Sequence, residues 1–515
     1  MNTKNINDQD FNNQLEYNIN NIYKRIFREL LISAISYYLI FTFLFIFSYN
    51  IFSSLFTKDS KINNNVNNVN ISNNQYMNNV QFSSFLAILN IPLYFQEFSY
   101  SLFNNNFMVL SFIYFNDSNT KLLLTKRDIY SYELLSKIYN LELSDYKLTY
   151  MQLTIDDLAL VNLFVNFYKD NSNKIFNLIF DSNLTFFKSY EYILPKENYK
   201  LEKVIYKEEV YYMLFSLFNK DEDLKSNDKV ILLKMDFNYQ VKDIKLIKLP
   251  YSITSIDFYY PFIFFNLIYN DQNKGLLIKI EDKSKLEFSS FFVDHNYTKL
   301  DFLNVVNFKD NYFLIFKSYD DSISNELIFI NINYHNKIKK IFAFKNDILN
   351  LIDIKKTVSF NDNLYFIYEI KNDEKVLGIF KINLFNYSYF NKVIFTNEER
   401  CIKLLDIGKI FNNLLLFWDY SQNDISILSL NLLNENKINN SIDPIFITDF
   451  DYYYKNNIQD KPNFYFDNKN FKIKLLLQKD FIIYMNKDYF NLNLLNKKII
   501  NEEDLKVSNK EINFF

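Results

Sequence analysis

The feature that most constrains this chain is an apolar run that returns at a nearly regular interval. Each run follows a polar turn containing Asn, Asp, Ser or Lys, as in Asn227-Asp-Lys229 before VILLKM. Eight such runs begin at positions 122, 175, 230, 275, 327, 376, 425 and 481, at intervals of 53, 55, 45, 52, 49, 49 and 56 residues. A fixed period of this size is typical of a repeat architecture, in which each unit buries its apolar faces against its neighbours.

A second apolar run precedes each polar turn, so that the two runs form a predicted hairpin. Examples are FMVLSFIYF (Phe107 to Phe115), VYYMLFSLF (Val210 to Phe218) and LYFIYEI (Leu364 to Ile370). These runs have 7–9 residues, are rich in Phe, Tyr, Ile and Val, and are apolar nearly throughout. Their length and composition predict strands, and the lack of alternation predicts strands that are covered on both faces. The sequence therefore predicts an all-β fold of sheets stacked face to face.

Units of this length with about four strands each resemble the blades of a generic β-propeller of the quinoprotein-like or WD40-like kind. The segments ELIFININYHNKIKKI (Glu326 to Ile341) and VLGIFKINLFNYSYF (Val376 to Phe390) have the blade layout. The resemblance is to the fold and to no specific family. It implies an eight-bladed β-propeller over residues 82–500, built from eight repeats of about 51 residues, with a seven-bladed ring as the alternative. Residues 82–95 are expected to supply a strand to the last sheet and close the ring.

Glycine is nearly absent, with 3 residues where ordinary composition would give about 36. Residues with GC-rich codons are scarce in general, which is typical of drift in an AT-rich genome. Propeller turns often need a residue with positive φ, and asparagine tolerates that conformation best after glycine. We therefore expect Asn183, Asn238, Asn336 and Asn386 at such positions. The same scarcity excludes glycine-rich nucleotide loops and nucleophile elbows.

One N-terminal segment predicts a membrane anchor. Residues 30–56 carry no charge and begin with LLISAISYYLIFTFLFIF, which is long enough to cross a bilayer as a helix. Basic residues on the preceding side favour a cytoplasmic (or matrix) N-terminus and a propeller on the opposite side, in an organellar inner membrane or a bacterial plasma membrane. The flanking segments are interpreted as a polar tail (1–29), an Asn-rich flexible tether (57–81) and a C-terminal tail (501–515).

Charge and cysteine content exclude several classes of function. The net charge is −3, from 57 basic and 60 acidic side chains, and the densest basic cluster is only Lys337, Lys339 and Lys340, so no nucleic-acid partner is expected. Cys401 is the only cysteine, which excludes a disulfide within the chain and a multi-cysteine metal site.

A search for catalytic chemistry assigns no catalytic, cofactor-binding or metal-binding residue. His295 and His335 are interpreted as exposed turn residues, and Trp418 as a core residue of a strand. Four acidic clusters are interpreted as solvated turns. They are Asp156-Asp157, Asp221-Glu222-Asp223, Asp320-Asp321 and Glu502-Glu503-Asp504.

These observations favour a membrane-anchored scaffold or accessory subunit with protein partners at a membrane, rather than an enzyme. One alternative is a surface receptor or adhesin of a wall-less or parasitic cell. Another is a propeller hydrolase or lyase that uses carboxylates in the central channel. The fold alone does not choose among the three, and two or more carboxylates at one channel mouth would favour the last.

Overall fold

Antiparallel sheets account for nearly all of the described backbone. The computed structural model describes residues between Phe85 and Phe514, apart from short gaps, most of them at turns, and longer gaps that include 218–227, 397–402, 432–444 and 450–462. The predicted tail (1–29), anchor (30–56) and tether (57–81) lie outside the described residues. Within those residues, no helix has the length and apolar character needed to cross a bilayer.

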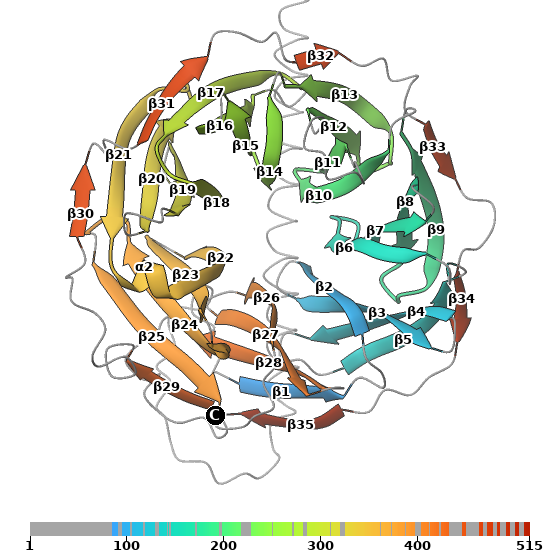
Figure 1. Cartoon of the computed structure of the whole chain (residues 1–515). Helices are drawn as coiled ribbons and strands as arrows, with labels where there is room; N and C mark the ends of the chain where they lie inside the picture. The colour runs from blue at the N-terminus through green and yellow to red at the C-terminus, as the bar shows by residue number, and fades with distance from the viewer. Residues whose placement is uncertain are drawn as a thin grey trace, which may run out of the picture. The chain divides into compact units, whose positions relative to one another are not determined.

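Seven five-stranded sheets are arranged as the blades of a β-propeller (Figure 1). In each blade four antiparallel strands lie side by side, with the first strand next to the centre of the ring and the fourth toward the outside. Blade 1 contains β2 (Phe95–Phe103), β3 (Phe107–Asn116), β4 (Asn119–Asp128) and β5 (Glu133–Leu141). Blade 2 contains β6 (Lys147–Ile155), β7 (Val161–Lys169), β8 (Ser172–Phe180) and β9 (Phe186–Ile193). Blade 3 contains β10 (Tyr199–Lys207), β11 (Val210–Leu217), β12 (Lys229–Asp236) and β13 (Val241–Lys248).

The remaining blades repeat this layout. Blade 4 contains β14 (Ser252–Tyr259), β15 (Phe262–Tyr269), β16 (Gln272–Ile280) and β17 (Phe288–His295). Blade 5 contains β18 (Lys299–Phe308), β19 (Asn311–Tyr319), β20 (Glu326–Asn333) and β21 (Ile338–Lys345), followed by the short helix α2 (Ile348–Leu351). Blade 6 contains β22 (Ile352–Phe360), β23 (Asn363–Ile370), β24 (Asp373–Asn383) and β25 (Tyr389–Thr396). Blade 7 contains β26 (Lys403–Ile410), β27 (Asn413–Ser421), β28 (Asp424–Asn431) and, as its fourth strand, β1 (Phe85–Asn90).

The prediction that an N-terminal strand closes the ring is confirmed. β1 lies in the expected segment 82–95 and pairs with β28, with Phe85 opposite Ser429 and Asn90 opposite Asp424. The last blade is therefore built from both ends of the propeller sequence, which holds the ring shut.

A C-terminal belt supplies the fifth strand of every blade. It consists of β29 (Ile445–Asp449), β30 (Asn463–Phe466), β31 (Phe471–Leu476), β32 (Ile482–Tyr484), β33 (Asn491–Leu494), β34 (Ile500–Glu503) and β35 (Asn509–Phe514). These strands pair in turn with β25, β21, β17, β13, β9, β5 and β1. The belt thus passes the blades in the reverse of their chain order and lies on the outside of the ring (Figure 1).

The belt corrects two predictions. Eight blades were expected, but the apolar run that starts at 481 forms β32, a three-residue belt strand on blade 3, and is not part of an eighth blade. The other seven runs are the third strands of the seven blades. The predicted C-terminal tail, 501–515, contains most of β34 and all of β35, because these residues pair with β5 and β1.

The core lies between neighbouring blades, as the uniformly apolar strands predicted. On β11, Tyr211, Met213 and Phe215 pack in a cluster with blade 2. The intervening residues Tyr212 and Leu214 pack in a different cluster with blade 4. Since successive side chains point to opposite faces of a strand, each central strand contributes to two separate hydrophobic layers.

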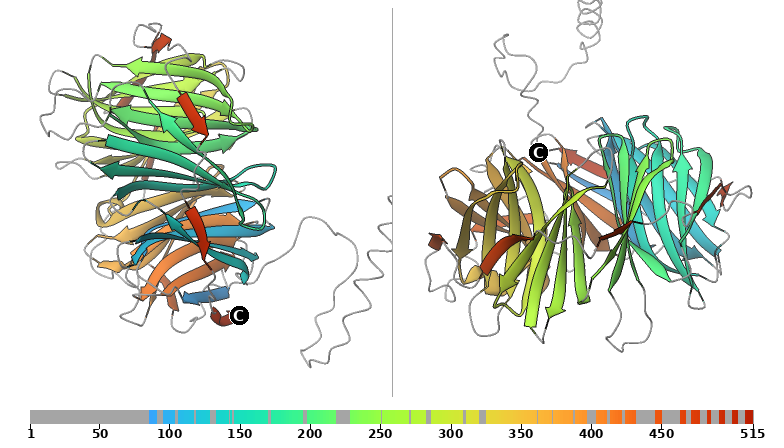
Figure 2. Two further views of the ribbon diagram at one scale, coloured as in Figure 1. Left: turned by 90° about the vertical axis from the view of Figure 1, so that its right-hand side faces the viewer. Right: turned by 90° about the horizontal axis from the view of Figure 1, so that it is seen from above.

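The ring has two rims, seen from the side in Figure 2. Because neighbouring strands are antiparallel, the first-to-second connections of all blades and the third-to-fourth connections of blades 1 to 6 lie at one rim. β1 begins at the same rim, since Phe85 lies opposite Ser429 near the end of β28. We call this the entry rim, defined by Phe85 and the turns 156–160, 181–185, 236–240 and 333–337. The opposite edge, with second-to-third turns such as 269–272, is the far rim.

Candidate functional site at the centre of the ring

Every innermost strand carries a register shift four to six residues before its last residue. Such β-bulges add one residue to a strand and redirect the side chains beside them. The shifts fall at Phe95/Glu97, Leu148/Tyr150, Leu201/Lys203, Ile253/Ser255, Phe302/Asn304, Ile354/Lys356 and Leu404/Asp406. The residue after each shift is polar, and four of the seven are charged. The repeat therefore places a ring of polar side chains around the centre of the propeller.

Five charged residues from five blades form a central cluster: Lys203, Asp257, Asp301, Lys356 and Asp406. Lys356 donates a hydrogen bond from Nζ to Oδ1 of Asp406 at 2.6 Å, which joins blades 6 and 7. Lys203 in blade 3 interacts electrostatically with Lys356, Asp406 and Asp257. In a ring of seven blades, blades 6 and 7 lie opposite blade 3. These charges therefore interact across the centre of the propeller.

Burial at the centre changes the acid–base properties of this cluster. Partial desolvation inside the ring, together with the positive charge of Lys356, lowers the pKa of Lys203. Burial, reinforced by the negative charge of Asp301, raises the pKa of Asp257 to about 6. Burial opposes the charge on Lys356, but Tyr100 and Asp406 together raise its pKa above the ordinary value. The centre thus holds charges of both signs in a partly desolvated environment.

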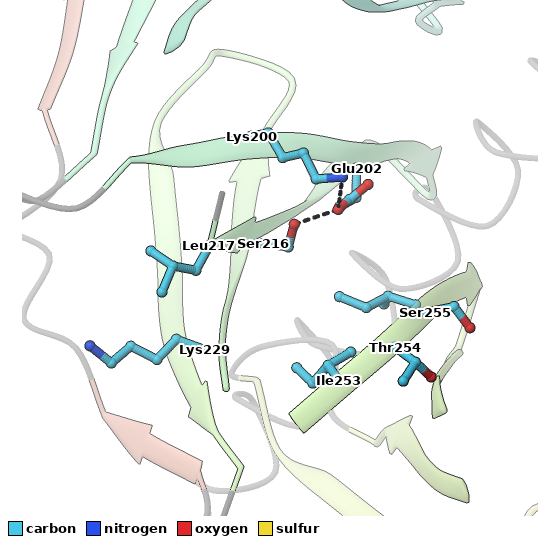
Figure 3. A pocket seen from close by; sticks show the side chains of 9 residues that line it. Lys200, Glu202, Ser216, Leu217, Lys229, Ile253, Thr254 and Ser255 are labelled. Atoms are coloured by element: carbon cyan, nitrogen blue, oxygen red, sulfur yellow. Dashed lines mark hydrogen bonds and ion pairs between the residues drawn. The ribbon is translucent and has the colours of Figure 1, made fainter. Parts of the chain in front are cut away.

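A pocket opens beside this cluster, between blades 3 and 4, with a volume of about 310 Å³ (Figure 3). It is lined by Lys200, Glu202, Ser216, Leu217, Lys229, Ile253, Thr254, Ser255 and Ile256. Glu202 and Thr254 are the extra residues at the two bulges of β10 and β14. The pocket lies toward the far rim, because Leu217 ends β11 and Lys229 begins β12 there.

Hydrogen bonds hold the walls of the pocket in place. Glu202 accepts a hydrogen bond from the hydroxyl of Ser216, and its Oε1 lies 2.9 Å from Nζ of Lys200. On the opposite wall, the side-chain amide of Asn266 donates to Oγ of Ser255 and to the carbonyl of Leu300, both at 2.7 Å. The arrangement offers charged and hydroxyl groups beside apolar side chains in a fixed frame, which suits the binding of one or two side chains of a larger molecule.

Among the residues that the structure describes, none of the histidines, acidic pairs or the tryptophan singled out from the sequence lines this pocket or belongs to the central cluster. His335 is exposed in its turn, as predicted. The prediction of an exposed turn is wrong for His295, which is 2% exposed and ends strand β17, where it lies opposite Phe471 of belt strand β31. Burial, with the nearby charge of Lys274, lowers the pKa of His295 to about 4. Trp418 lies within strand β27, as predicted.

One acidic cluster differs from its predicted solvated state. Asp156 is 1% exposed, and its Oδ1 accepts hydrogen bonds from the backbone N–H of Leu158 and Leu160, so it stabilises a turn at the entry rim. Asp157 is exposed, as predicted. The clusters 221–223 and 320–321 lie outside the described residues, as do Asp504 and Cys401.

The central cluster does not follow from the apolar period, because that period marks the third strand of each repeat. A second period runs through the innermost strands. Polar residues recur there at Glu97, Tyr150, Lys203, Ser255, Asn304, Lys356 and Asp406, at intervals of 53, 53, 52, 49, 52 and 50 residues. Aligning the units on this polar position would have identified the ring.

Comparison with known proteins supplies no family. No protein-family model matches the chain, and no curated protein matches it. Among solved structures, the chain is similar to a subtype N10 neuraminidase-like protein of A/little yellow-shouldered bat/Guatemala/060/2010, at 10% identity and a TM-score of 0.31, over 67% of this chain and 97% of that one. This likeness carries no argument about activity, and the β-propeller is assigned from the strand order described above.

Proposed function

We propose that this protein is a membrane-anchored β-propeller that acts as a protein-interaction scaffold or accessory subunit of a membrane-associated complex. The observation that carries the proposal is the pocket between blades 3 and 4. Its volume of about 310 Å³ is at the lower end of ligand pockets, and its walls are fixed by hydrogen bonds within and between blades. A pocket of this size suits a few side chains of a partner protein.

The frame around the pocket supports the same function. Strand β1 closes the ring, and a belt strand pairs with every blade. These contacts restrict the movement of the blades that form the pocket. A preorganised surface loses less conformational entropy on binding, which favours recognition of a defined partner. The charge-free segment 30–56 would hold this surface at a membrane, with the N-terminus on the cytoplasmic (or matrix) side.

A matched pair of substitutions tests the pocket as a partner site. Thr254 and Thr149 are both exposed bulge residues, and each donates a hydrogen bond to the carbonyl of an asparagine on the next strand, at 3.2 and 3.0 Å. Only Thr254 lines the pocket. Thr254→Trp would fill the pocket, whereas Thr149→Trp changes an equivalent position elsewhere.

The measurement is purification of the full-length protein from native membranes in mild detergent, followed by mass spectrometry. We expect Thr254→Trp to reduce the co-purifying partner about tenfold, and Thr149→Trp to leave it unchanged. Equal recovery of the same partners with both variants would exclude the pocket as the binding site.

A second candidate function, a hydrolase, is favoured by one observation. Asp257 and Asp301 interact electrostatically at the centre, and the pKa of Asp257 is raised to about 6, mainly by burial. A pair of interacting carboxyl groups, one of them with a raised pKa, is what glycoside hydrolysis requires. This function predicts glycosidase activity that is abolished by Asp257→Asn and by Asp301→Asn while partner binding is retained. A wild-type protein without turnover on a panel of glycosides would remove it.

A further inference from the structure

Exposed apolar side chains are concentrated on one rim of the propeller. Ten large hydrophobic residues are strongly exposed among those described, and six of them lie at the entry rim. These six are Leu134, Leu158, Phe187, Tyr334, Phe385 and Tyr389. They stand in the turns 156–160, 333–337 and 383–388, or within the first two residues of the outer strands β5, β9 and β25.

The most exposed side chains of the set all lie at the entry rim. The four most exposed side chains of the set are Phe385 at 74%, Leu158 at 62%, Phe187 at 60% and Leu134 at 56%, and all belong to the entry rim. At the far rim, Ile193, Ile268 and Tyr269 are only 37–41% exposed. Exposed apolar side chains gathered on one edge of a fold provide the contacts that a membrane surface or a partner molecule would cover.

The chain itself reaches the propeller at this rim. Strand β1 begins there with Phe85, and the charge-free segment 30–56 lies upstream. Only the 28 residues 57–84 separate the two. Even when fully extended, 28 residues span no more than about 100 Å. A bilayer entered by residues 30–56 would therefore stay within that distance of the rim, so that even a weak attraction suffices.

The polar side chains beside the apolar ones suit a lipid headgroup region. The exposed lysines Lys337, Lys339 and Lys340 follow Tyr334 in and after the turn of blade 5. Aromatic side chains mixed with lysines are typical of protein surfaces at a membrane interface, because the rings lie at headgroup level while the ammonium groups meet lipid phosphates.

We propose that the entry rim docks on the surface of the lipid bilayer, inserting Phe385, Leu158, Phe187 and Leu134 among the headgroups. The far rim, with its pocket between blades 3 and 4, then faces away from the membrane. This orientation rests on the proposed membrane anchoring, and it adds the lipid surface as a partner of a second, defined face of the ring.

Single-tryptophan fluorescence in the full-length protein tests the docking. In a Trp418→Phe background, Phe385→Trp places the only tryptophan at the entry rim, and Tyr269→Trp places it at the far rim as the matched control. The proteins are reconstituted in vesicles of phosphatidylcholine and phosphatidylglycerol that carry lipids nitroxide-labelled near the headgroup. We expect quenching of the Phe385→Trp emission to exceed that of Tyr269→Trp by about twofold or more.

A second set of variants shows whether the apolar side chains cause the effect. Adding Leu158→Ser and Phe187→Ser to the Phe385→Trp protein should reduce the quenching, whereas adding Ile193→Ser and Ile268→Ser should not. Equal quenching at the two rims, absence of quenching at Phe385→Trp, or crosslinking of the rim to a second protein copy instead of lipid would each overturn the proposal.

Alkaline carbonate extraction of the wild-type protein separates this proposal from the one on which it rests. Release from the membrane would refute the anchor, and the docking with it. Retention without quenching at Phe385→Trp would refute the docking alone and leave the scaffold function standing.

Discussion

The three glycines of this chain are retained for space and not for turn conformation. All three lie in strands, and none has positive φ. A Cβ on Gly275 would lie 2.7 Å from the ring of Phe264, and one on Gly408 would lie 2.9 Å from the hydroxyl of Tyr100. At Gly378 a Cβ would overlap the ring of Tyr368. Glycine therefore persists in this chain where an aromatic ring lies across the backbone.

Gly378→Ala should be one of the most destabilising small substitutions in the chain. Tyr368 is fully buried, and its hydroxyl donates to Oδ1 of Asn391 at 2.6 Å, so the ring cannot move aside freely. We expect a loss of about 2–3 kcal/mol in the free energy of unfolding, measured by urea denaturation. Gly408→Ala, where the neighbouring atoms are further away, should cost less. Equal stability of wild type and Gly378→Ala would contradict this packing.

The turn residues show what the sequence could and could not predict at this scale. Asn336 has positive φ as predicted, but in two equivalent turns that conformation falls one residue later, on Leu184 and Tyr239, instead of on Asn183 and Asn238. The reason is the first residue of the turn. Oδ1 of Asp181 accepts hydrogen bonds from the backbone N–H of Asn183 and Thr185, which fixes the turn whatever side chain follows. Asn386, in the turn between β24 and β25, does not have positive φ, so the prediction is wrong there.

At the scale of strands, the blade strands were predictable and the belt strands were not. A central strand such as β11 contributes to two hydrophobic layers, so its sequence is apolar over most of its length. A belt strand covers an edge and has one buried side. In β31, FKIKLL, Phe471 and Ile473 are buried while Lys472 and Lys474 are exposed. Strands of three to six residues with such mixed sequences give too weak a pattern to separate from loops.

The alternation in β31 leads to a prediction about the belt. Ile473 lies opposite Val293 and is 8% exposed, so Ile473→Ser should cost about 2 kcal/mol in the free energy of unfolding. Lys474→Ser, on the exposed side of the same strand, should cost less than about 0.5 kcal/mol. Chemical denaturation of both variants measures the difference. Comparable small effects would mean that the belt adds little to blade 4.

A buried lysine in blade 5 makes stability depend on pH. Lys317 is fully buried, and its Nζ donates to the carbonyl of Ile352 at 2.7 Å. Burial, with a smaller contribution from Lys371, lowers the pKa of Lys317 to about 8. The unfolded chain, with a lysine pKa of about 10.4, then binds more protons between pH 8 and pH 10, so this residue makes the fold more stable as the pH rises through that window.

Lys317→Met removes this titration and serves as the reference. At pH 7 the variant should melt at a higher temperature than wild type, because the charged form of Lys317 is poorly solvated. The difference in Tm should shrink steadily between pH 8 and pH 10. A difference that stays constant over this range would show that Lys317 titrates normally.

At the scale of the whole ring, closure depends on one N-terminal strand. A protein that begins at Phe85 keeps β1 between β28 and β35, whereas one that begins at Phe95 leaves both strands without their partner. We expect the first to be a folded monomer and the second to melt at a lower temperature and to associate through the open edges. Light scattering and thermal unfolding compare the two. Identical behaviour would mean that β1 is dispensable for closure.

The candidate site shows the limit of sequence at this scale. The need for a closing strand could be predicted, because the last sheet of a closed ring otherwise lacks one of its strands. The central cluster could be predicted only in part. Lys203, Lys356 and Asp406 share the polar position that recurs along the innermost strands, whereas Asp257 and Asp301 lie off that period and join them only once seven blades surround one axis.

The belt also constrains how such a gene can change. In a ring whose blades are each one contiguous repeat, duplicating or deleting a single repeat adds or removes a complete blade. Here the fifth strand of every blade is encoded in the separate belt segment, and the belt strands follow the blades in reverse order. A duplicated blade would find no belt strand, and a deleted blade would leave one belt strand without a sheet. A viable change of blade number requires two matched events in one gene, and the belt therefore fixes the size of the ring over evolutionary time.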